Sequence, residues 1–247
     1  MSAGQCGGLL CRLGWDTPPG AVTAGVYAVI GGDLVAVCGG GGDAARRAES
    51  ARGARRIDDG ERLYEPVMFD DRVVGVLQCP AAAAGADPAA LAARLAPLLL
   101  GANRDGAIER NLRVLDWVIS ARDIAADVCD WTGVYYKASF VLGEEGTDLL
   151  LGPFLGAPTP HQRIPIGNGI CGLALREERA VNVPDVRADP RYLACSAETR
   201  SELVVPLADG RGEFVAELDI DSRRAQGFPP ALEERFRSFA RTFAYCL

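Results

Sequence analysis

The pattern of apolar and polar residues along the chain predicts a mixed α+β protein. Apolar residues recur at helical spacing from Ala107 to Val128 and again after Pro229 and Pro230, which is typical of amphipathic helices. A further helix is expected in AALAARLAPLLLG, where Pro97 could introduce a kink. Short runs rich in β-branched and aromatic residues, bounded by Gly, Asp and Pro, predict strands. These runs are TGVYYKASFVL, TDLLLGPFLG, SELVVPL and GEFVAELDID.

The N-terminal and C-terminal halves of the chain share a weak internal repeat. AGVYAVIGGDLVAVCGG resembles TGVYYKAS and TDLLLGPF, and RLYEPVMFDDRVVGVLQCP resembles RSELVVPLADGRGEFVAELDID. The alternative is a chance similarity between hairpins. The repeat predicts two related α+β modules, a smaller one over residues 1–103 and a larger one over residues 104–247. Residues 39–60 lack hydrophobic periodicity, so we expect a loop there.

Composition and charge exclude several classes of partner. The 247 residues are 49% hydrophobic and 24% charged, as in ordinary globular proteins. The net charge of −7 argues against nucleic acid and anionic membrane surfaces as partners. No apolar run approaches the roughly 20 residues of a membrane span, and the N-terminal sequence MSAGQCGGLLCRLGWD does not resemble a signal peptide. We therefore expect a cytoplasmic protein.

One expected strand, EFVAELDID, places acidic residues on a single face. Alternation along a strand directs Val215, Glu217, Asp219 and Asp221 to the same side. Neighbouring carboxylates repel each other, so they are either solvated at a sheet edge or neutralised by a cation. The strand follows a hairpin and precedes a helix, which favours a central position and a cation. The chain has one histidine, His161, and no C-x-x-C pair, so we expect a ligand ammonium group rather than a metal.

Two of the eight cysteines lie in the same half of the chain as these carboxylates. Eight cysteines in a long chain without a secretion signal are expected to be mostly reduced. Cys171, in GNGICGLAL, is expected in a tight turn that enters a helix, where the pKa of a thiol falls. Cys195 is expected in a polar loop. The two thiols could reach each other above one sheet, or both could be buried and inert.

Several motifs together resemble a known family. DWTGVYY, LLLGPFLG, RIPIGNGICGLAL, NVPDV, YLACSAETRSELVVPL and LDIDS occur in this order. Over residues 131–228 they resemble the free methionine-(R)-sulfoxide reductases, which are GAF-fold enzymes. The resemblance rests on two cysteines 24 residues apart, a glutamate seven residues after the second, and Asp-x-Asp on the following strand. It implies a GAF-like antiparallel sheet with flanking helices, preceded by a smaller, degenerate GAF-like α+β module.

The resemblance also implies a site and a reaction. Cys195 would attack the sulfur of free methionine sulfoxide and become a sulfenic acid, and Cys171 would resolve it as a disulfide. A thioredoxin-like dithiol would then reduce the disulfide, with no bound cofactor and no metal. Trp131 and Tyr135 would wall the pocket. The remaining implied site residues are carboxylates that hold the substrate ammonium group: Glu202, Asp219 and Asp221.

One departure from the family pattern leaves alternatives open. The family usually carries a third cysteine ten residues before Cys171, where this chain has His161. The alternative function is a non-catalytic GAF sensor that binds a small amino-acid-like ligand, or that senses oxidation through Cys171 and Cys195. The helices expected over residues 107–128 and 228–247 are candidates for pairing in a homodimer, which is compatible with either function.

Overall fold

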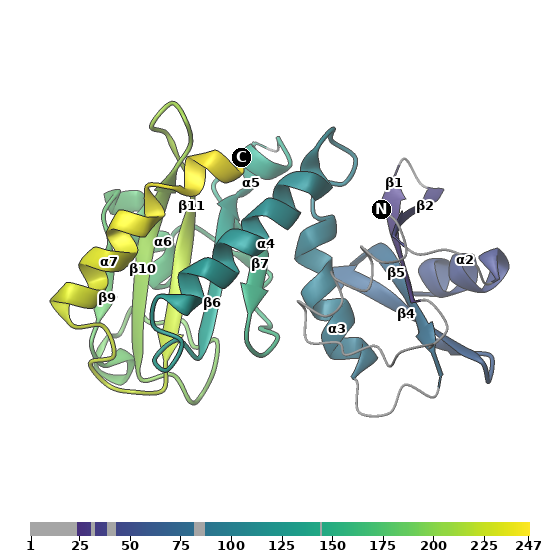
Figure 1. Ribbon diagram of the computed structural model, residues 1–247, viewed down its shortest axis with the longest axis horizontal. Helices are drawn as coiled ribbons and strands as arrows, with labels where there is room; N and C mark the ends of the chain where they lie inside the picture. Colours follow the sequence, from purple (N-terminus) through teal and green to yellow (C-terminus); the bar gives the residue numbers. More distant parts are fainter. Residues whose placement is uncertain (1–23, 31–32, 39–42, 82–86, 144) are drawn as a thin grey trace. The chain divides into compact units, whose positions relative to one another are not determined.

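The computed structural model describes residues 24–30, 33–38, 43–81, 87–143 and 145–247 (Figure 1). The chain divides into two compact units, residues 1–108 and residues 109–247. None of the helices in the described part of the chain is long and apolar enough to cross a membrane. That the first unit is a degenerate GAF-like module stays a prediction.

The first unit is built on a five-stranded antiparallel sheet with strand order β2-β1-β5-β4-β3. Its strands are β1 (Gly25–Ile30), β2 (Asp33–Cys38), β3 (Ile57–Asp58), β4 (Arg62–Phe69) and β5 (Arg72–Pro80). Its helices are α2 (Ala44–Gly53), α3 (Pro88–Leu95) and the 3-10 turn η1 (Ala96–Leu99). Helix α3 begins where expected, because the Asp87 side chain accepts hydrogen bonds from the first-turn N–H groups and proline follows it.

The prediction of a loop over residues 39–60 is wrong at the centre of this segment, which forms helix α2. This helix packs through polar side chains, so its sequence carries no apolar stripe. Buried Ser50 donates a hydrogen bond to the Tyr64 carbonyl over 3.1 Å, and the Arg47 guanidinium lies 4.2 Å from the centre of the Tyr27 ring. The Ala, Arg and Glu residues of α2 are strong helix formers, and that intrinsic propensity was the signal available in the sequence.

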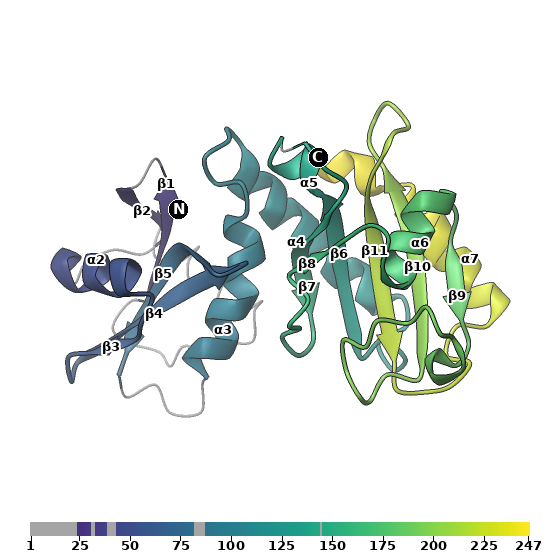
Figure 2. The same ribbon diagram turned by 180° about the vertical axis from the view of Figure 1, so that it is seen from behind.

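The second unit is a six-stranded antiparallel sheet with strand order β8-β7-β6-β11-β10-β9. Its strands are β6 (Trp131–Lys137), β7 (Leu149–Leu155), β8 (Arg163–Ile164), β9 (Val181–Val183), β10 (Ser201–Ala208) and β11 (Phe214–Ser222). Its helices are α4 (Ala107–Asp123), α5 (Ala138–Val141), α6 (Gly169–Glu177), η2 (Val186–Ala188), α7 (Pro230–Ala240) and η3 (Phe243–Cys246). Helices α4 and α7 cover one face of the sheet (Figure 1), and α6 lies on the opposite face (Figure 2).

Aromatic packing joins the first and last helices of this unit. The Trp117 ring on α4 stacks on Phe239 with centroids 4.8 Å apart, and it meets Phe243 edge-on at 5.2 Å. Its indole N–H also donates a 2.8 Å hydrogen bond to the Thr242 hydroxyl. Trp117 therefore closes the hydrophobic core on the α4 and α7 face, where each buried aromatic ring contributes about 2–3 kcal/mol of stability.

The carboxylate strand β11 is central, as predicted, because it lies between β6 and β10. In the β10–β11 register Glu202 faces Asp221 and Val204 faces Asp219. Directly opposed residues project to the same side of a sheet, so this register gathers the acidic side chains of both strands on the face that α6 covers.

Strand β9 covers only part of its neighbour. It pairs with Glu202, Leu203 and Val204 of β10. Among the described residues, no further strand pairs with the outer edge of the remaining segment, Val205 to Ala208. Strand β10 is therefore enclosed at its N-terminal half and open at its C-terminal half.

Candidate functional site

Four carboxyl side chains are buried together beneath α6. The relative exposures are 4% for Glu202, 0% for Glu217, 2% for Asp219 and 4% for Asp221. Three of them were expected site residues. Glu217 was placed on this strand face by its alternation but was not counted among the site residues, although the two-residue spacing was the signal that could have included it.

Several carboxyl oxygens of this group lack any hydrogen-bond partner in the structure. They are Glu202 Oε2, both oxygens of Glu217 and Asp219 Oδ1. Burial, followed by repulsion from the neighbouring carboxylates, raises the pKa of Glu202, Glu217 and Asp221 well above the usual range. Burial also raises the pKa of Asp219, to about 7. A buried ionised carboxylate without a partner is costly, so this group needs either protons or a cation.

Cys171 lies directly above these carboxylates. Helix α6 begins at Gly169, whose positive φ of 69° favours glycine, and Cys171 is its third residue. The Cys171 sulfur lies 3.9 Å from Glu202 Oε1 and 3.7 Å from Asp219 Oδ2. The side chain is only 4% exposed, so this thiol faces the carboxylates and not the solvent.

The expected fall in the pKa of the Cys171 thiol is wrong. Burial raises the pKa well above the ordinary value, and Glu217, Asp219 and Glu202 raise it further. A helix N-terminus stabilises an anion by at most about 2 kcal/mol, whereas full burial shifts a pKa by up to about 3–5 pH units. Desolvation therefore outweighs the position of Cys171 at the start of α6.

Cys195 occupies the loop between η2 and β10 and is half-buried. Its sulfur lies 3.7 Å from the Leu193 carbonyl. Burial raises the pKa of this thiol, and the neighbouring carboxylates Asp219, Asp221 and Glu202 raise it further, while a hydrogen bond with Thr159 opposes them. Both Cys171 and Cys195 are free thiols, and both lie within the electrostatic reach of Asp219.

A small pocket of about 60 Å³ opens beside Cys195. The residues that line it come from the start of β6, the loop after β7, the loop before β10 and the end of β11: Asp130, Trp131, Ala157, Pro158, Thr159, Cys195, Ser196, Glu198, Thr199, Asp221 and Arg223. Trp131 forms a wall, as expected, and its ring stacks on Phe154 at 5.6 Å. Tyr135 is fully buried opposite Glu217 and is not among the lining residues.

His161 connects the loops around the pocket. Its Nε2 atom lies 3.0 Å from the carbonyl oxygen of Ala194, the residue before Cys195, so Nε2 carries the proton that is donated. The Tyr135 hydroxyl donates a 2.9 Å hydrogen bond to the His161 carbonyl. His161, at the position of the family's third cysteine, therefore anchors the Cys195 loop to β6. No local pattern in the sequence indicated this role, because the two loops are far apart along the chain.

Arg223 provides the positive charge at the pocket. Its guanidinium forms ion pairs with Glu198 at 2.6 Å and with Asp130 at 3.7 Å. All three side chains line the pocket and are partly exposed. The sequence analysis missed Arg223. Its position two residues after Asp221 was the available signal, because the end of a strand adjoins the loops that close a site.

The comparisons with known proteins agree with this architecture. The sequence model of the GAF domain matches residues 120–247, which is more than half of the chain. The chain belongs to the GAF domain family. The predicted GAF fold, an antiparallel sheet with flanking helices, is thereby confirmed for the second unit.

Three relatives of known name share this GAF domain. Protein YtsP of Bacillus subtilis is 37% identical over 118 residues, 48% of this chain and 68% of that protein. The free methionine-R-sulfoxide reductase of Saccharomyces cerevisiae is 36% identical over 120 residues, 49% of this chain and 63% of that protein. The Escherichia coli protein of the same name is 40% identical over 85 residues, 34% of this chain and 50% of that protein. The resemblance stated from the motifs is confirmed.

The chain is also similar to solved structures. The type II free methionine-R-sulfoxide reductase of Thermoplasma acidophilum is 32% identical with a TM-score of 0.48, covering 56% of this chain and 93% of that one. The free methionine-R-sulfoxide reductase of Neisseria meningitidis, solved in complex with its substrate, is 28% identical with a TM-score of 0.45, covering 66% of this chain and 92% of that one.

Proposed function

We propose that this protein reduces free methionine-(R)-sulfoxide to methionine through Cys195. The observation that supports this most directly is the half-buried Cys195 thiol lining one pocket with Asp221, beside buried carboxyl oxygens that have no partner. A ligand for this site carries a positive charge and a sulfur that a thiol can attack. Relatives that are 36–40% identical carry the name of this activity.

The charges around the pocket suit a free amino acid. The ammonium group would lie against Glu202, Asp219 and Asp221, where it would pair with the oxygens of Glu202 and Asp219 that have no partner. The substrate carboxylate would pair with Arg223 at the rim, and the thioether methyl would contact Trp131. A methionine sulfoxide residue inside a peptide has neither terminal charge, so it leaves the buried carboxylates unpaired and is rejected.

The substrate charge would also activate the nucleophile. Without ligand, burial and the three neighbouring carboxylates hold the pKa of Cys195 above its ordinary value, so the thiol is protonated at neutral pH. An ammonium group among the carboxylates offsets their negative charge, which lowers the pKa of the thiol. The proposed enzyme therefore forms its thiolate only when substrate is bound, and this protects Cys195 from unspecific oxidation.

The proposed chemistry has three balanced steps. The Cys195 thiolate attacks the sulfoxide sulfur while a protonated carboxyl, Asp219, delivers a proton to the sulfoxide oxygen. The oxygen then moves to the Cys195 sulfur and the bond between the two sulfurs breaks. The sulfoxide gains two electrons and leaves as methionine, and Cys195 loses two electrons and becomes a sulfenic acid. The Cys171 sulfur then attacks the Cys195 sulfur, which forms a disulfide and releases water. A thioredoxin-like dithiol supplies two electrons and two protons by exchange and restores both thiols.

A thioredoxin-coupled turnover assay on the two diastereomers of free methionine sulfoxide tests this proposal. We expect turnover of the R form alone. Cys195→Ser should lower the turnover rate at least about 1,000-fold, because it removes the nucleophile. Cys171→Ser should give one methionine per protein and then stop. Cys246→Ser is the matched control, because this free thiol lies at the C-terminus away from the pocket, and it should turn over like the parent protein.

Different experimental results would contradict different parts of this proposal. Fully reduced protein that turns over neither diastereomer would sink the enzymatic proposal. If that protein nevertheless shows a large thermal shift with free methionine, the alternative of a non-catalytic GAF sensor gains support. Equal turnover of a peptide containing methionine sulfoxide would contradict the role of the buried carboxylates in selecting a free amino acid.

A further inference from the structure

We propose that the reduced protein binds one Zn²⁺ ion at Cys171, Glu202 and Asp219, beneath the pocket. This binding does not depend on the proposed reductase activity. The three side chains come from three different elements, α6, β10 and β11, and all three are buried. The sequence offered no sign of such a site, because its ligands follow no C-x-x-C or histidine spacing.

The distances between the ligand atoms match a zinc ion. One atom from each of the three side chains lies within 4.8 Å of the others. The Cys171 sulfur is 3.9 Å from a Glu202 oxygen and 3.7 Å from an Asp219 oxygen. Zinc binds sulfur at about 2.3 Å and oxygen at about 2.0 Å, so at a tetrahedral angle the two ligand atoms are roughly 3.5 Å apart. Each of the two sulfur–oxygen distances therefore needs to shorten by only a few tenths of an ångström.

The unsatisfied oxygens of the same side chains are an independent sign of a missing cation. Glu202 Oε2 and Asp219 Oδ1 are buried without a hydrogen-bond partner, as are both oxygens of neighbouring Glu217. No lysine or arginine forms an ion pair with these carboxylates among the described residues. A divalent cation neutralises two carboxylates at once and offsets the desolvation of the buried group. Glu217, next to the ligands, can serve as a fourth ligand or as a hydrogen-bond donor to one of them.

The chemistry of the donors selects zinc over the commoner divalent cations. Mg²⁺ and Ca²⁺ prefer oxygen ligands alone, and Ca²⁺ takes six to eight of them. A thiolate combined with carboxylates suits a borderline-soft ion that accepts four ligands. Zinc holds Cys171 as a thiolate, so binding displaces the proton that burial otherwise retains.

Zinc at this position would interfere with the proposed reaction. It would occupy the acidic end of the pocket, where the substrate ammonium group is expected. It would also bind the Cys171 sulfur, which could then no longer form the disulfide with Cys195. The inference predicts reversible inhibition that a chelator removes. This consequence, unlike the binding itself, rests on the proposed function.

Titration of the chelator-treated, reduced protein with Co²⁺ tests the site through a signal independent of activity. We expect one equivalent to produce the near-ultraviolet absorption of a thiolate–cobalt bond, and Zn²⁺ to displace it. Cys171→Ser should abolish this absorption. Glu202→Gln should weaken Co²⁺ binding about tenfold or more. Two matched controls should leave both signal and affinity unchanged: Cys246→Ser, which removes a thiol elsewhere, and Glu177→Gln, which removes an exposed carboxylate of α6.

The proposal is overturned if the parent protein shows no thiolate–cobalt absorption, or if the absorption survives Cys171→Ser. Circular dichroism of the variants separates lost binding from lost folding, and Glu202→Gln gives a second test should Cys171→Ser fold poorly. Turnover is measured on the same samples. Activity without the absorption sinks the zinc site alone, whereas the absorption without activity leaves the zinc site standing and sinks the reductase proposal.

Discussion

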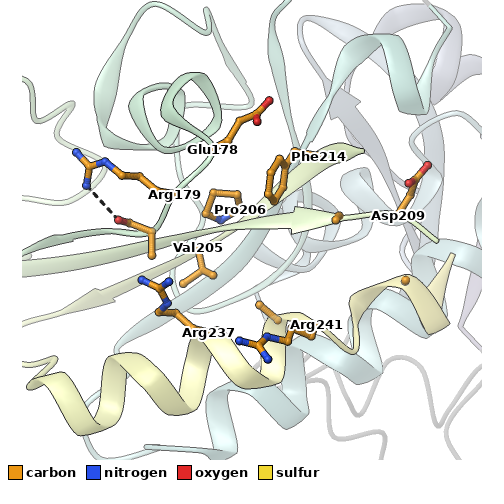
Figure 3. Close-up of a pocket in the computed structure, with 12 residues that line it drawn as sticks. Glu178, Arg179, Val205, Pro206, Asp209, Phe214, Arg237 and Arg241 are labelled. Carbon is orange, nitrogen blue, oxygen red and sulfur yellow. Dashed lines mark hydrogen bonds between the residues drawn. The ribbon is translucent and has the colours of Figure 1, made fainter. Parts of the chain in front are cut away.

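Two pockets of the second unit differ in the charge of the side chains around them. The pocket beside Cys195 is small and has carboxylates buried beneath it. The other pocket, of about 410 Å³, lies between the end of α6 and helix α7 and is lined by three arginines, Arg179, Arg237 and Arg241 (Figure 3). Its arginines are exposed. Arg237 pairs with Glu233 at 3.6 Å, and Arg179 pairs with Glu177.

The contrast shows which charges point to a ligand. Exposed arginines are solvated, and their ion pairs contribute about 0–1 kcal/mol each, so the larger pocket is stable without an occupant. The four carboxyl side chains beneath α6 are buried from solvent and form no ion pair among the described residues, so their ionised forms are unfavourable and a bound cation stabilises them. The proposed reaction is therefore assigned to the smaller pocket, because its charged groups and not its volume favour a cationic ligand.

Because a buried carboxylate is unfavourable when it is ionised, the free energy of unfolding should depend on pH. The pKa of Asp219 is about 7 in the folded protein, against an ordinary value of 3.8 for an aspartate in water, so the folded state binds a proton that the unfolded state releases. Its stabilising contribution is complete below about pH 4 and is lost as the pH rises through about 7. Urea unfolding of the ligand-free protein should show stability falling by a few kcal/mol over this range.

Asp219→Asn should flatten this profile and stabilise the protein at pH 8, because the amide cannot ionise. Glu178→Gln, a carboxyl change in the arginine-lined pocket, should leave the profile unchanged. Stability that stays constant or rises between pH 5 and pH 8 in the parent protein would contradict the argument that the buried carboxylates lack partners.

The substrate affinity should respond to the same carboxylates but more weakly. Glu202→Gln should raise KM for free methionine-(R)-sulfoxide about 10- to 100-fold, because a hydrogen bond to a charged group contributes about 1.5–3 kcal/mol. Steady-state kinetics of the parent, Glu202→Gln and Glu178→Gln proteins provide the measurement. An unchanged KM in Glu202→Gln, with a changed KM in Glu178→Gln, would move the substrate to the other pocket.

The smallest effect is expected in the arginine-lined pocket. Arg241 directly follows the last residue of α7, is exposed and lines this pocket together with Arg237. Arg241→Gln should change the free energy of unfolding by less than about 0.5 kcal/mol and leave turnover unaffected. Chemical denaturation and the coupled assay report both quantities. A loss of turnover in this variant would show that the arginine-lined pocket is linked to the pocket beside Cys195.

Much of the fold and part of the site could be predicted from the sequence, because strand alternation is a strong local signal. The expected face of GEFVAELDID is the observed one, and the central position of β11 brings Asp219 and Asp221 under α6. Helix α2 was missed because its packing is polar. The strand expected from TGVYYKASFVL ends at Lys137, where α5 begins, because strand and helix propensities overlap in short apolar runs.

The rest of the site depends on contacts that a local pattern cannot contain. The hydrogen bond from His161 to Ala194 joins loops 33 residues apart, and Arg223 lines the pocket by following a bend after β11. The sign of the pKa shift at Cys171 depends on how deeply α6 is packed. The sequence placed this thiol at a helix start, but only the structure supplies the competing desolvation.

The open half of β10 has a consequence for association between chains. An unpaired strand edge is a template on which another chain can add a strand, and this is a common route to aggregation. Pro206 lies within the uncovered segment and has no N–H group to offer an incoming strand. A proline in a sheet is tolerated where its nitrogen faces away from the paired neighbour. We therefore expect Pro206 to weaken the pairing of another chain with the outer edge of β10.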